Sequence, residues 1–431
     1  MSGGVAAPLG SRARRTGSVV SDLSAILLIL IGIVGLWDDR PWITFICALV
    51  LIVVLVSRAW ARLALTEVSY EPRLSRTQLV QGDTFSLSMT LENKKPIPLP
   101  WLRLREIVPS GLELASGSAG EIGKTFNGSL EISETLGLGG YERAHLTLDL
   151  KAARRGHYAF GPANLRSGDI FGFYQVQQSL SPRGVELVVF PKPANLPPIP
   201  IPAFRPNGDT VTRSGLTEDI SRPNGSREFR AGDSRGRIDW KVSARQGAPF
   251  VRTFDPSVTE CVVLGVDCAT NIHDHWGIDT DVLENTISTA ATLVTRNLNQ
   301  GHRLGLVCNG TPLSGQTPPV IPPGAGKGQR VHLMNCLAAA GAITTRPIET
   351  LMQHHGASVL PSGAAFLYIA GVIRPSTLDF LKHRQSKGNR ILVLYTGRDA
   401  PPRDLGLAMI DLRAAFEADE TAADSGRARY G

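Results

Sequence analysis

The stretch from residue 213 to residue 256 holds the side chains whose types and spacing best suit specific binding. Between positions 222 and 252 it carries eight cationic side chains against three carboxylates, Glu228, Asp233 and Asp239. The carboxylates stand between the cations instead of apart from them. Because a planar guanidinium donates two hydrogen bonds to one carboxylate, this spacing favours a fixed Arg–carboxylate lattice. The cations are Arg222, Arg227, Arg230, Arg235, Arg237, Lys241, Arg245 and Arg252.

The same charges admit a second interpretation. Arg–carboxylate pairs are most often scaffold, but the cationic excess leaves guanidiniums free to receive an acidic partner segment or a phosphate. Gly232-Asp233 predicts a turn, and Arg237–Arg245 predicts a short helix with Trp240 as its apolar anchor. The candidate site residues, as a protein contact or a structural lattice, are Arg227, Glu228, Arg230, Asp233, Arg237, Asp239, Trp240, Lys241 and Arg245.

The order of residues in this stretch carries a family resemblance. R-E-F-R-x-G-D-x-x-x-x-I-D-W-K-x-S-A-R, at 227–245, is followed by V-R-x-F at 251–254. This pattern closely resembles the signature of the domain-of-unknown-function-58 (DUF58) family, and the segment Arg154–Tyr174 resembles the part that precedes it there. The resemblance implies a membrane-anchored protein that works beside a MoxR-type AAA+ ATPase. It identifies no reaction.

Two apolar stretches near the N-terminus, at 19–37 and 42–60, have about the twenty residues needed to cross a bilayer. The short connector between them predicts an antiparallel membrane hairpin within a first domain, 1–64. Arginines flank both outer ends, so the positive-inside bias places the N-terminal tail and everything from about residue 65 onward in the cytoplasm. A signal peptide and a buried core hairpin are the alternatives, but a second span opposes cleavage and neither run has a polar face.

The middle of the chain, 65–192, changes to short runs that alternate apolar and polar residues, as in Thr84–Asn93 and Trp101–Val108. Several such runs predict a β-sandwich of immunoglobulin-like type. Within it, the G-D-x-F-G turn at 168–172 and its aromatic neighbours are interpreted as backbone geometry and core. Residues 193–212 predict a proline-rich linker of semi-rigid, polyproline-like character, and residues 416–431 predict a disordered tail.

Buried-strand patterns and amphipathic helices alternate through 257–415, which follows the 213–256 motif. Cys261–Asp267, Arg303–Gly310, Ala364–Gly371 and Arg390–Gly397 are apolar runs of the kind that parallel sheets cover on both faces. The region therefore predicts a doubly wound α/β domain. Its order of elements resembles the von Willebrand factor A fold.

Asp267 ends the first of these runs, where ligands bind in such folds. The von Willebrand factor A resemblance implies a cation site of the form D-x-S-x-S, but the sequence here is Asp267-Cys268-Ala269-Thr270-Asn271. Ala269 has no oxygen to donate, so a hard Mg²⁺ ion loses a ligand. No acid ends the later run near Gly371, and Thr344 or Thr345 is the loosely aligned threonine. Asp267 is a weak metal candidate; no cofactor and no metal are expected.

Composition excludes several other classes. The net charge of +7 is concentrated near the apolar stretches and the motif, which argues against a nucleic-acid surface. Five cysteines without C-x-x-C pairing predict free thiols in a reducing compartment. Gly324–Gly328 lacks the spacing of a phosphate loop, no serine stands in a G-x-S-x-G elbow, and the paired histidines at 273, 275, 354 and 355 lack matching ligands.

The sequence therefore predicts a non-enzymatic, membrane-tethered cytoplasmic interaction module. The resemblance implies a MoxR-type AAA+ ATPase as partner, in the assembly or maturation of an unknown client protein. Two alternatives stay open: a metal-dependent hydrolase or nuclease that uses Asp267, and a structural cell-envelope protein.

Overall fold

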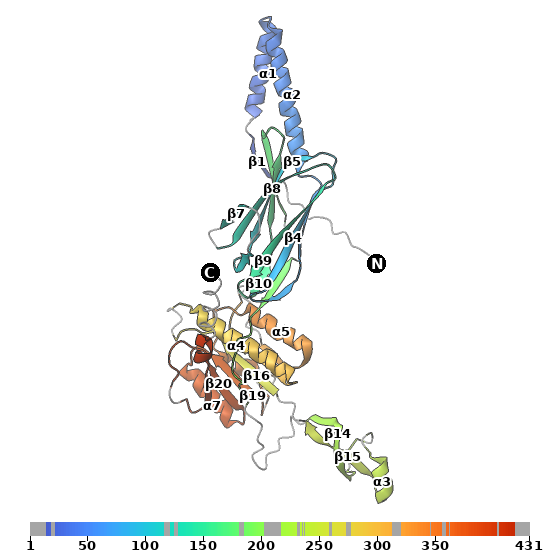
Figure 1. The fold of residues 1–431 in the computed structure, drawn as a ribbon, viewed down its shortest axis with the longest axis vertical. Helices are drawn as coiled ribbons and strands as arrows, with labels where there is room; N and C mark the ends of the chain where they lie inside the picture. The colour runs from blue at the N-terminus through green and yellow to red at the C-terminus, as the bar shows by residue number, and fades with distance from the viewer. Residues whose placement is uncertain are drawn as a thin grey trace. The chain divides into compact units, whose positions relative to one another are not determined.

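In the computed structural model, the chain forms two compact units, Met1–Phe190 and Pro191–Gly431. The N-terminal unit holds two apolar helices and a β-sandwich, and the C-terminal unit holds an Arg-rich hairpin and an α/β sheet (Figure 1). The structure describes residues 14–18, 22–115, 121–124, 128–180, 185–201, 217–230, 233–234, 236, 238–257, 261–272, 277–312, 320–344, 346–355, 359–361, 363–402 and 405–418.

The two apolar helices, α1 (Asp22–Trp37) and α2 (Pro41–Ala64), lie side by side and contact each other (Figure 1). A Cβ at Gly35 of α1 would lie only 3.0 Å from Ile43 of α2, so this glycine lets the helices come close. Thr44 Oγ1 of α2 donates a hydrogen bond to the Gly32 carbonyl at 2.9 Å. At 1.5 Å per residue α2 is about 36 Å long. Among the described residues it is the helix long and apolar enough to cross a membrane, whereas the apolar part of α1, Ala25–Trp37, is shorter.

The sandwich contains a six-stranded sheet in the order β1-β12-β11-β5-β8-β7, a four-stranded sheet β2-β4-β9-β6 and a three-stranded sheet β10-β13-β3. The strands are β1 (Arg14–Ser18), β2 (Val68–Leu74), β3 (Gln78–Val80), β4 (Thr84–Asn93), β5 (Leu99–Val108), β6 (Leu112–Leu114), β7 (Glu121–Lys124), β8 (Leu130–Leu138), β9 (Arg143–Ala152), β10 (Gly156–Ala159), β11 (Ala163–Gly168), β12 (Tyr174–Leu180) and β13 (Glu186–Phe190).

Alternation along the strands builds the sandwich core, as the sequence predicts. The side chains of β4 alternate between exposed and buried, which puts Phe85, Leu87, Met89 and Leu91 inside. They belong to one cluster with inward residues of β5 such as Leu102, so the four-stranded and six-stranded sheets share a core. Strand β1 was not predicted. It pairs with β12 and occupies an edge of the six-stranded sheet that would otherwise present unpaired backbone groups.

A buried lysine joins α2 to the sandwich. Lys95 is 5 % exposed, and its Nζ donates to the carbonyls of Ala64 at 2.7 Å and Thr66 at 2.8 Å. These are carbonyls at the C-terminal end of α2, where backbone acceptors lack intrahelical partners and a cation is favoured. Burial lowers the pKa of Lys95, against the attraction of Glu67, which raises it. The Lys95 side chain therefore caps the C-terminal end of α2 and links it to the sandwich by hydrogen bonds.

The proline-rich segment that was predicted as a linker packs on a helix over its described part. Leu196 is buried, Thr292 Oγ1 of α4 (Thr280–Asn299) donates to Ala194 O at 3.0 Å, and Arg296 donates to Pro197 O at 2.8 Å. Arg296 also donates to Leu196 O. Residues 194–197 are thus fixed to the C-terminal unit because their backbone carbonyls accept hydrogen bonds from α4. Residues 202–212 lie outside the described ranges.

The α/β sheet has the order β18-β17-β16-β19-β20-β21, with every neighbouring pair parallel except the β17–β18 pair. Buried side chains of α6 and α7 share a cluster with Val263, Phe366 and Val393, while α4 and α5 contact each other and the sheet. Successive side chains of each strand point to opposite faces of the sheet, so one set packs toward α6 and α7 and the other toward α4 and α5. The elements are β16 (Cys261–Asp267), β17 (Arg303–Cys308), β18 (Val320–Gly324), α5 (Gly326–Ala339), α6 (Ile348–His355), β19 (Ala365–Ala370), α7 (Pro375–Ser386), β20 (Arg390–Tyr395) and β21 (Ala408–Asp411).

The Arg-rich hairpin consists of β14 (Thr217–Glu228) and β15 (Phe250–Ser257), with α3 (Trp240–Gln246) between them. The two strands pair antiparallel from Thr217↔Ser257 to Glu228↔Phe250. At the other end of the unit, residues 413–418 are helical, so the predicted disordered tail begins later than residue 416. Residues 419–431 lie outside the described ranges.

Candidate functional site

The first carboxylate of the Arg-rich hairpin, Asp233, closes the turn after β14. Arg227 holds it with two hydrogen bonds, Nη1 to Oδ2 at 2.8 Å and Nη2 to Oδ1 at 2.7 Å. The amide of Arg230 donates to the same carboxylate at 2.8 Å. The Arg227 and Arg230 hydrogen bonds together lower the pKa of Asp233 to about 2. Asp233 therefore stays ionised at neutral pH and works as a structural acceptor.

The second carboxylate, Asp239, begins α3. Its Oδ1 accepts the amides of Lys241 at 3.2 Å and Val242 at 3.3 Å, the arrangement of a helix N-cap. Its Oδ2 accepts Arg252 Nε from β15 at 3.3 Å. Desolvation raises the pKa of Asp239, but the hydrogen bonds from Val242 and Arg252 prevail and lower it. The two aspartates thus tie the turn, the helix and both strands together, which is the predicted lattice.

The side chains of the remaining candidates take no part in this lattice. Trp240 is 73 % exposed, so its prediction as the anchor of the helix is wrong. The reason is that α3 is held by polar groups: Ser243 Oγ accepts the Phe250 amide at 2.8 Å, and the helix has no buried side chain. Lys241, Arg245 and Glu228 are also exposed.

No carboxylate lies within ion-pair distance of Arg230, Lys241 or Arg245 among the described residues. Lys241 and Arg245 are four residues apart on α3, so they share one face of this short helix. The hairpin therefore presents an indole and a group of cations on a frame that its own acids hold rigid. Arg237, a further candidate, lies outside the described residues, as do Arg235 and the Gly232 part of the predicted turn.

The second candidate, Asp267, lies where the strand order of the α/β sheet reverses. β16 has β17 on one side and β19 on the other, so the carboxyl ends of β16 and β19 form the topological switch point at which such folds bind ligands. Asp267 is only 2 % exposed. Its Oδ1 accepts Asn309 Nδ2 at 2.7 Å and the Ala269 amide at 3.0 Å, and its Oδ2 accepts the Tyr368 hydroxyl at 2.7 Å.

Three protein donors thus bind the two oxygens of this carboxylate. Burial raises the pKa of Asp267, against the hydrogen bonds from Asn309 and Tyr368, which lower it. A cation would have to displace two donors that are themselves fully buried. Among the described residues, no group of three His, Cys, Asp or Glu side chains could hold a metal ion. Thr344 bridges to Gly310 through its backbone, and Thr345, His273 and His275 lie outside the described residues.

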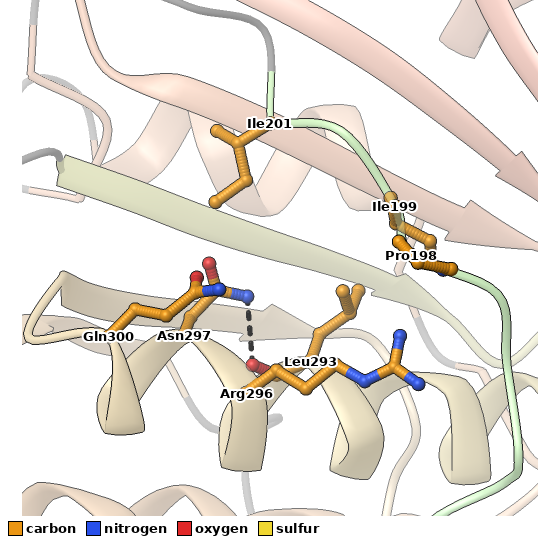
Figure 2. Close-up of a pocket in the computed structure, with 7 residues that line it drawn as sticks. All are labelled: Pro198, Ile199, Ile201, Leu293, Arg296, Asn297 and Gln300. Atoms are coloured by element: carbon orange, nitrogen blue, oxygen red, sulfur yellow. Dashed lines mark hydrogen bonds between the residues drawn. The ribbon is translucent and has the colours of Figure 1, made fainter.

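A shallow pocket lies between the proline-rich segment and α4 (Figure 2). Its volume of about 200 Å³ is below the range of roughly 300–1,000 Å³ that is usual for small-molecule sites. Asn297 Nδ2 donates a hydrogen bond to Leu293 O at 2.8 Å, so this donor is already used within α4 (Figure 2). The lining residues are Pro198, Ile199, Ile201, Leu293, Arg296, Asn297 and Gln300.

Part of the chain, including the Arg-rich hairpin, is similar to a known protein family. Residues 225–360 match the family described as "Protein of unknown function DUF58". The matched stretch begins within β14 and runs through the Arg-rich hairpin, Asp267 and α6. A distant relative, the uncharacterized protein YeaD of Bacillus subtilis, is 22% identical over 324 residues, which are 75% of this chain and 74% of that protein. The family match thus covers residues 225–360, and the relative extends the similarity to three quarters of the chain at low identity.

Two of the similar solved structures each match less than a third of the chain. Native alpha-2-macroglobulin from Escherichia coli is 14% identical with a TM-score of 0.22, and the match covers 29% of this chain and 23% of that one. A cohesin module from a Clostridium perfringens glycoside hydrolase is 12% identical with a TM-score of 0.23, and the match covers 29% of this chain and 97% of that one. The fold of the N-terminal unit follows from its strand pairing and not from these similarities.

The DUF58 stretch also gathers three thiols that the sequence leaves apart. Cys268 Sγ lies 3.7 Å from Cys308 Sγ, and all three of Cys268, Cys308 and Cys336 are buried. The hydrogen bond to Cys308 and burial raise the pKa of Cys336, so the Cys336 thiol is protonated at neutral pH. Their apolar runs gave the one signal that they lie inside, and strand order gave the rest. The three side chains are buried packing groups of the α/β sheet and its helices.

Proposed function

We propose that this protein is a membrane-anchored, non-enzymatic interaction module that presents the Arg-rich hairpin to an acidic surface of a partner protein. The observation that carries the proposal is that the acids and the exposed residues of the hairpin have different contacts. Asp233 and Asp239 accept hydrogen bonds within the hairpin, while Trp240, Lys241 and Arg245 are exposed on α3. Tryptophan and arginine are the residues that most often dominate protein interfaces.

The partner that we propose is a MoxR-type AAA+ ATPase, acting with this protein in the assembly or maturation of a client. This choice rests on the DUF58 resemblance. The charge of the hairpin adds a requirement on chemistry: the contacting surface of the partner should be acidic, so that association is faster at low salt.

We further propose that α1 and α2 form a two-span hairpin with both ends in the cytoplasm. Support comes from the strands that flank the pair, because β1 precedes α1, β2 follows α2, and both belong to sheets of the same unit. Two ends held in one folded body lie on one side of a bilayer, and the arginines at 12, 14, 15, 58 and 62 favour the cytoplasmic side. We also propose that the α/β sheet and its helices form a von Willebrand factor A-like domain.

The metal-dependent hydrolase is the weaker alternative, since Asp267 is closed in by Asn309, Tyr368 and the Ala269 amide. The structural envelope protein differs from our proposal only in lacking a regulated partner. An ATPase that stays at the membrane after deletion of this chain would favour that alternative.

A photo-crosslinking amino acid at position 240 tests the proposal in cells. We expect a crosslink to a MoxR-type ATPase that disappears when Lys241 and Arg245 are both changed to Glu. The matched control is the same amino acid at Val331, which is exposed on α5 of the same unit. Equal crosslinking from both positions, or crosslinks that ignore the charge reversal, would refute the proposed surface.

A further inference from the structure

The turn between β11 and β12 exposes apolar side chains that the sequence assigned to the core. Ile170 is 61 % exposed and Phe171 is 60 % exposed. The ring of Phe171 stacks on that of Phe173, with centroids 5.8 Å apart. We call residues 169–173 the aromatic tip. Exposed Phe and Ile side chains on one short turn form a surface that favours an apolar partner.

The aromatic tip is built to hold this shape. Asp169 is 1 % exposed, and its carboxylate accepts the amides of Phe171 at 3.0 Å and Tyr174 at 2.7 Å. Trp101 Nε1 donates to the Asp169 carbonyl at 3.3 Å. The single charge of the tip is therefore used internally, and the tip presents only apolar side chains and backbone. A turn whose charge is hydrogen-bonded internally and whose exposed side chains are apolar can enter a surrounding of low polarity.

The strand register places the tip at the end of the sandwich that carries the apolar helices. Tyr174, the first residue after the tip, lies opposite Ser18 of β1. Ser18 is four residues before the start of α1 at Asp22, so the chain connection spans at most about 14 Å. On the other side, β11 and β12 both contact α2 (Figure 1).

The burial pattern of α2 is consistent with strands β11 and β12 packing along it. Val54, Ser57, Ala61 and Ala64 are buried, at the three- and four-residue spacing of one helical stripe, while Leu55 and Val56 beside them are exposed. The stripe begins well inside the apolar part of the helix. The strands that bear the aromatic tip thus lie along a helix that still presents apolar side chains to its surroundings.

From this geometry we infer that the aromatic tip inserts into the membrane–water interface and forms a third contact of the protein with lipid. The inference rests on the proposed membrane anchoring. The occupant is lipid because the strands that carry the tip, β11 and β12, contact α2, and α2 exposes apolar side chains. Aromatic side chains favour the interfacial region, and shallow apolar insertions of this kind reach about 5–10 Å into it. The tip would fix the tilt of the sandwich on the bilayer.

The test uses the full chain, purified and reconstituted in vesicles, with an environment-sensitive fluorescent amino acid placed genetically at one position at a time. Position 171 reports the tip, and position 170 repeats the measurement should a probe at 171 disturb folding. Leu49, 52 % exposed on α2, reports membrane anchoring itself. Ile107, 37 % exposed on β5, is the matched control because it lies five residues beyond Leu102, roughly 17 Å farther along the sheet from the tip.

Each probe is measured in vesicles whose lipids carry a nitroxide quencher either near the headgroup or deep in the acyl chain. We expect position 171 to be quenched best by the shallow label, position 49 best by the deep label, and position 107 several-fold less than either. Quenching at 49 without quenching at 170 or 171 would overturn the inference and leave the anchoring intact. Loss of quenching at 49 would refute the anchoring, and the inference with it.

Two further outcomes would also overturn it. Equal quenching at 107 and 171 would mean that the whole sandwich lies on the membrane. Blue-shifted emission at 171 without quenching would place the tip against protein, such as a second copy of this chain.

Discussion

Replacing Asp267 by Ala and by Asn separates a hydrogen-bonded anchor from a metal ligand. In Asp267→Ala the buried donors of Asn309, Ala269 and Tyr368 lose their acceptor. The Tyr368 hydroxyl can turn to Thr377, with which it already interacts, so two donors remain unsatisfied. At about 1–3 kcal/mol for each buried unsatisfied group, the loss of local stability is about 2–6 kcal/mol.

Asp267→Asn should cost far less. The amide oxygen can keep both bonds on the Oδ1 side, and its NH₂ group faces the Tyr368 hydroxyl, which can act as acceptor. We expect a change below about 1 kcal/mol. The two substitutions therefore differ by more than the measurement error, although both remove the negative charge.

Amide hydrogen exchange of the full chain, read by mass spectrometry on peptides from β16 and β19, measures this difference. Exchange follows the free energy of local opening, and 1.4 kcal/mol corresponds to a factor of ten. Asp267→Ala should exchange at least about 30-fold faster than the wild type and Asp267→Asn should remain near it. Equal losses in both variants would show that the charge itself is required, as a bound cation demands. Stabilisation of the wild type by millimolar Mg²⁺ would refute the reasoning in the same way.

The pH dependence of the same peptides has a defined sign. Burial raises the folded-state pKa of Asp267 above the unfolded value of about 3.9. The folded state therefore binds the proton more tightly, and its contribution to stability is complete below about pH 3.9 and is lost as pH rises through the folded pKa. Relative to Asp267→Asn, the wild type should lose protection as pH rises through that window. A difference that grows in the opposite direction would contradict the assignment.

Three further predictions follow from other contacts. The contribution of Asp233 should be present above about pH 4 and lost as pH falls toward its folded pKa of about 2, so pepsin should cleave Asp233→Asn faster than the wild type at pH 4 but not at pH 2. Lys95→Met should lower stability in detergent by about 1–3 kcal/mol, because the buried carbonyl of Ala64 and the partly buried carbonyl of Thr66 lose a donor, whereas Lys94→Met, at a half-exposed site, should not. A reporter fused after Gly431 should be active in the cytoplasm, and activity outside would refute the orientation.

The sequence predicts those elements whose burial is decided by local pattern. The strands around Val263 and Phe366 are continuous apolar runs because helices cover both faces of the sheet, and the strand at 84–93 alternates because one face meets a core. The interleaved charges predict Arg–carboxylate pairing near the turn, and the structure assigns Arg227 to Asp233. In each case the information lies within about a dozen residues.

Features decided by distant contacts were missed. The side of a two-turn helix that is buried depends on what packs against it, and α3 is fixed by Asp239 and Ser243, so the pattern around Trp240 could not reveal an exposed indole. Residues 194–197 look like a linker until Arg296, about a hundred positions later, donates to their carbonyls. Strand order alone brings Cys268 to Cys308.

The pairing of β1 with β12 dictates an order of events during synthesis. Arg14 lies opposite Gln177, 163 residues later in the chain. At about 5–20 residues per second, a ribosome needs roughly 10–30 s to supply that partner strand. Both apolar helices have left the ribosome by then, so the six-stranded sheet closes only after their synthesis. During this interval the first strand lacks its partner strand. Once the sheet closes, the outer ends of both helices are tied to one folded body.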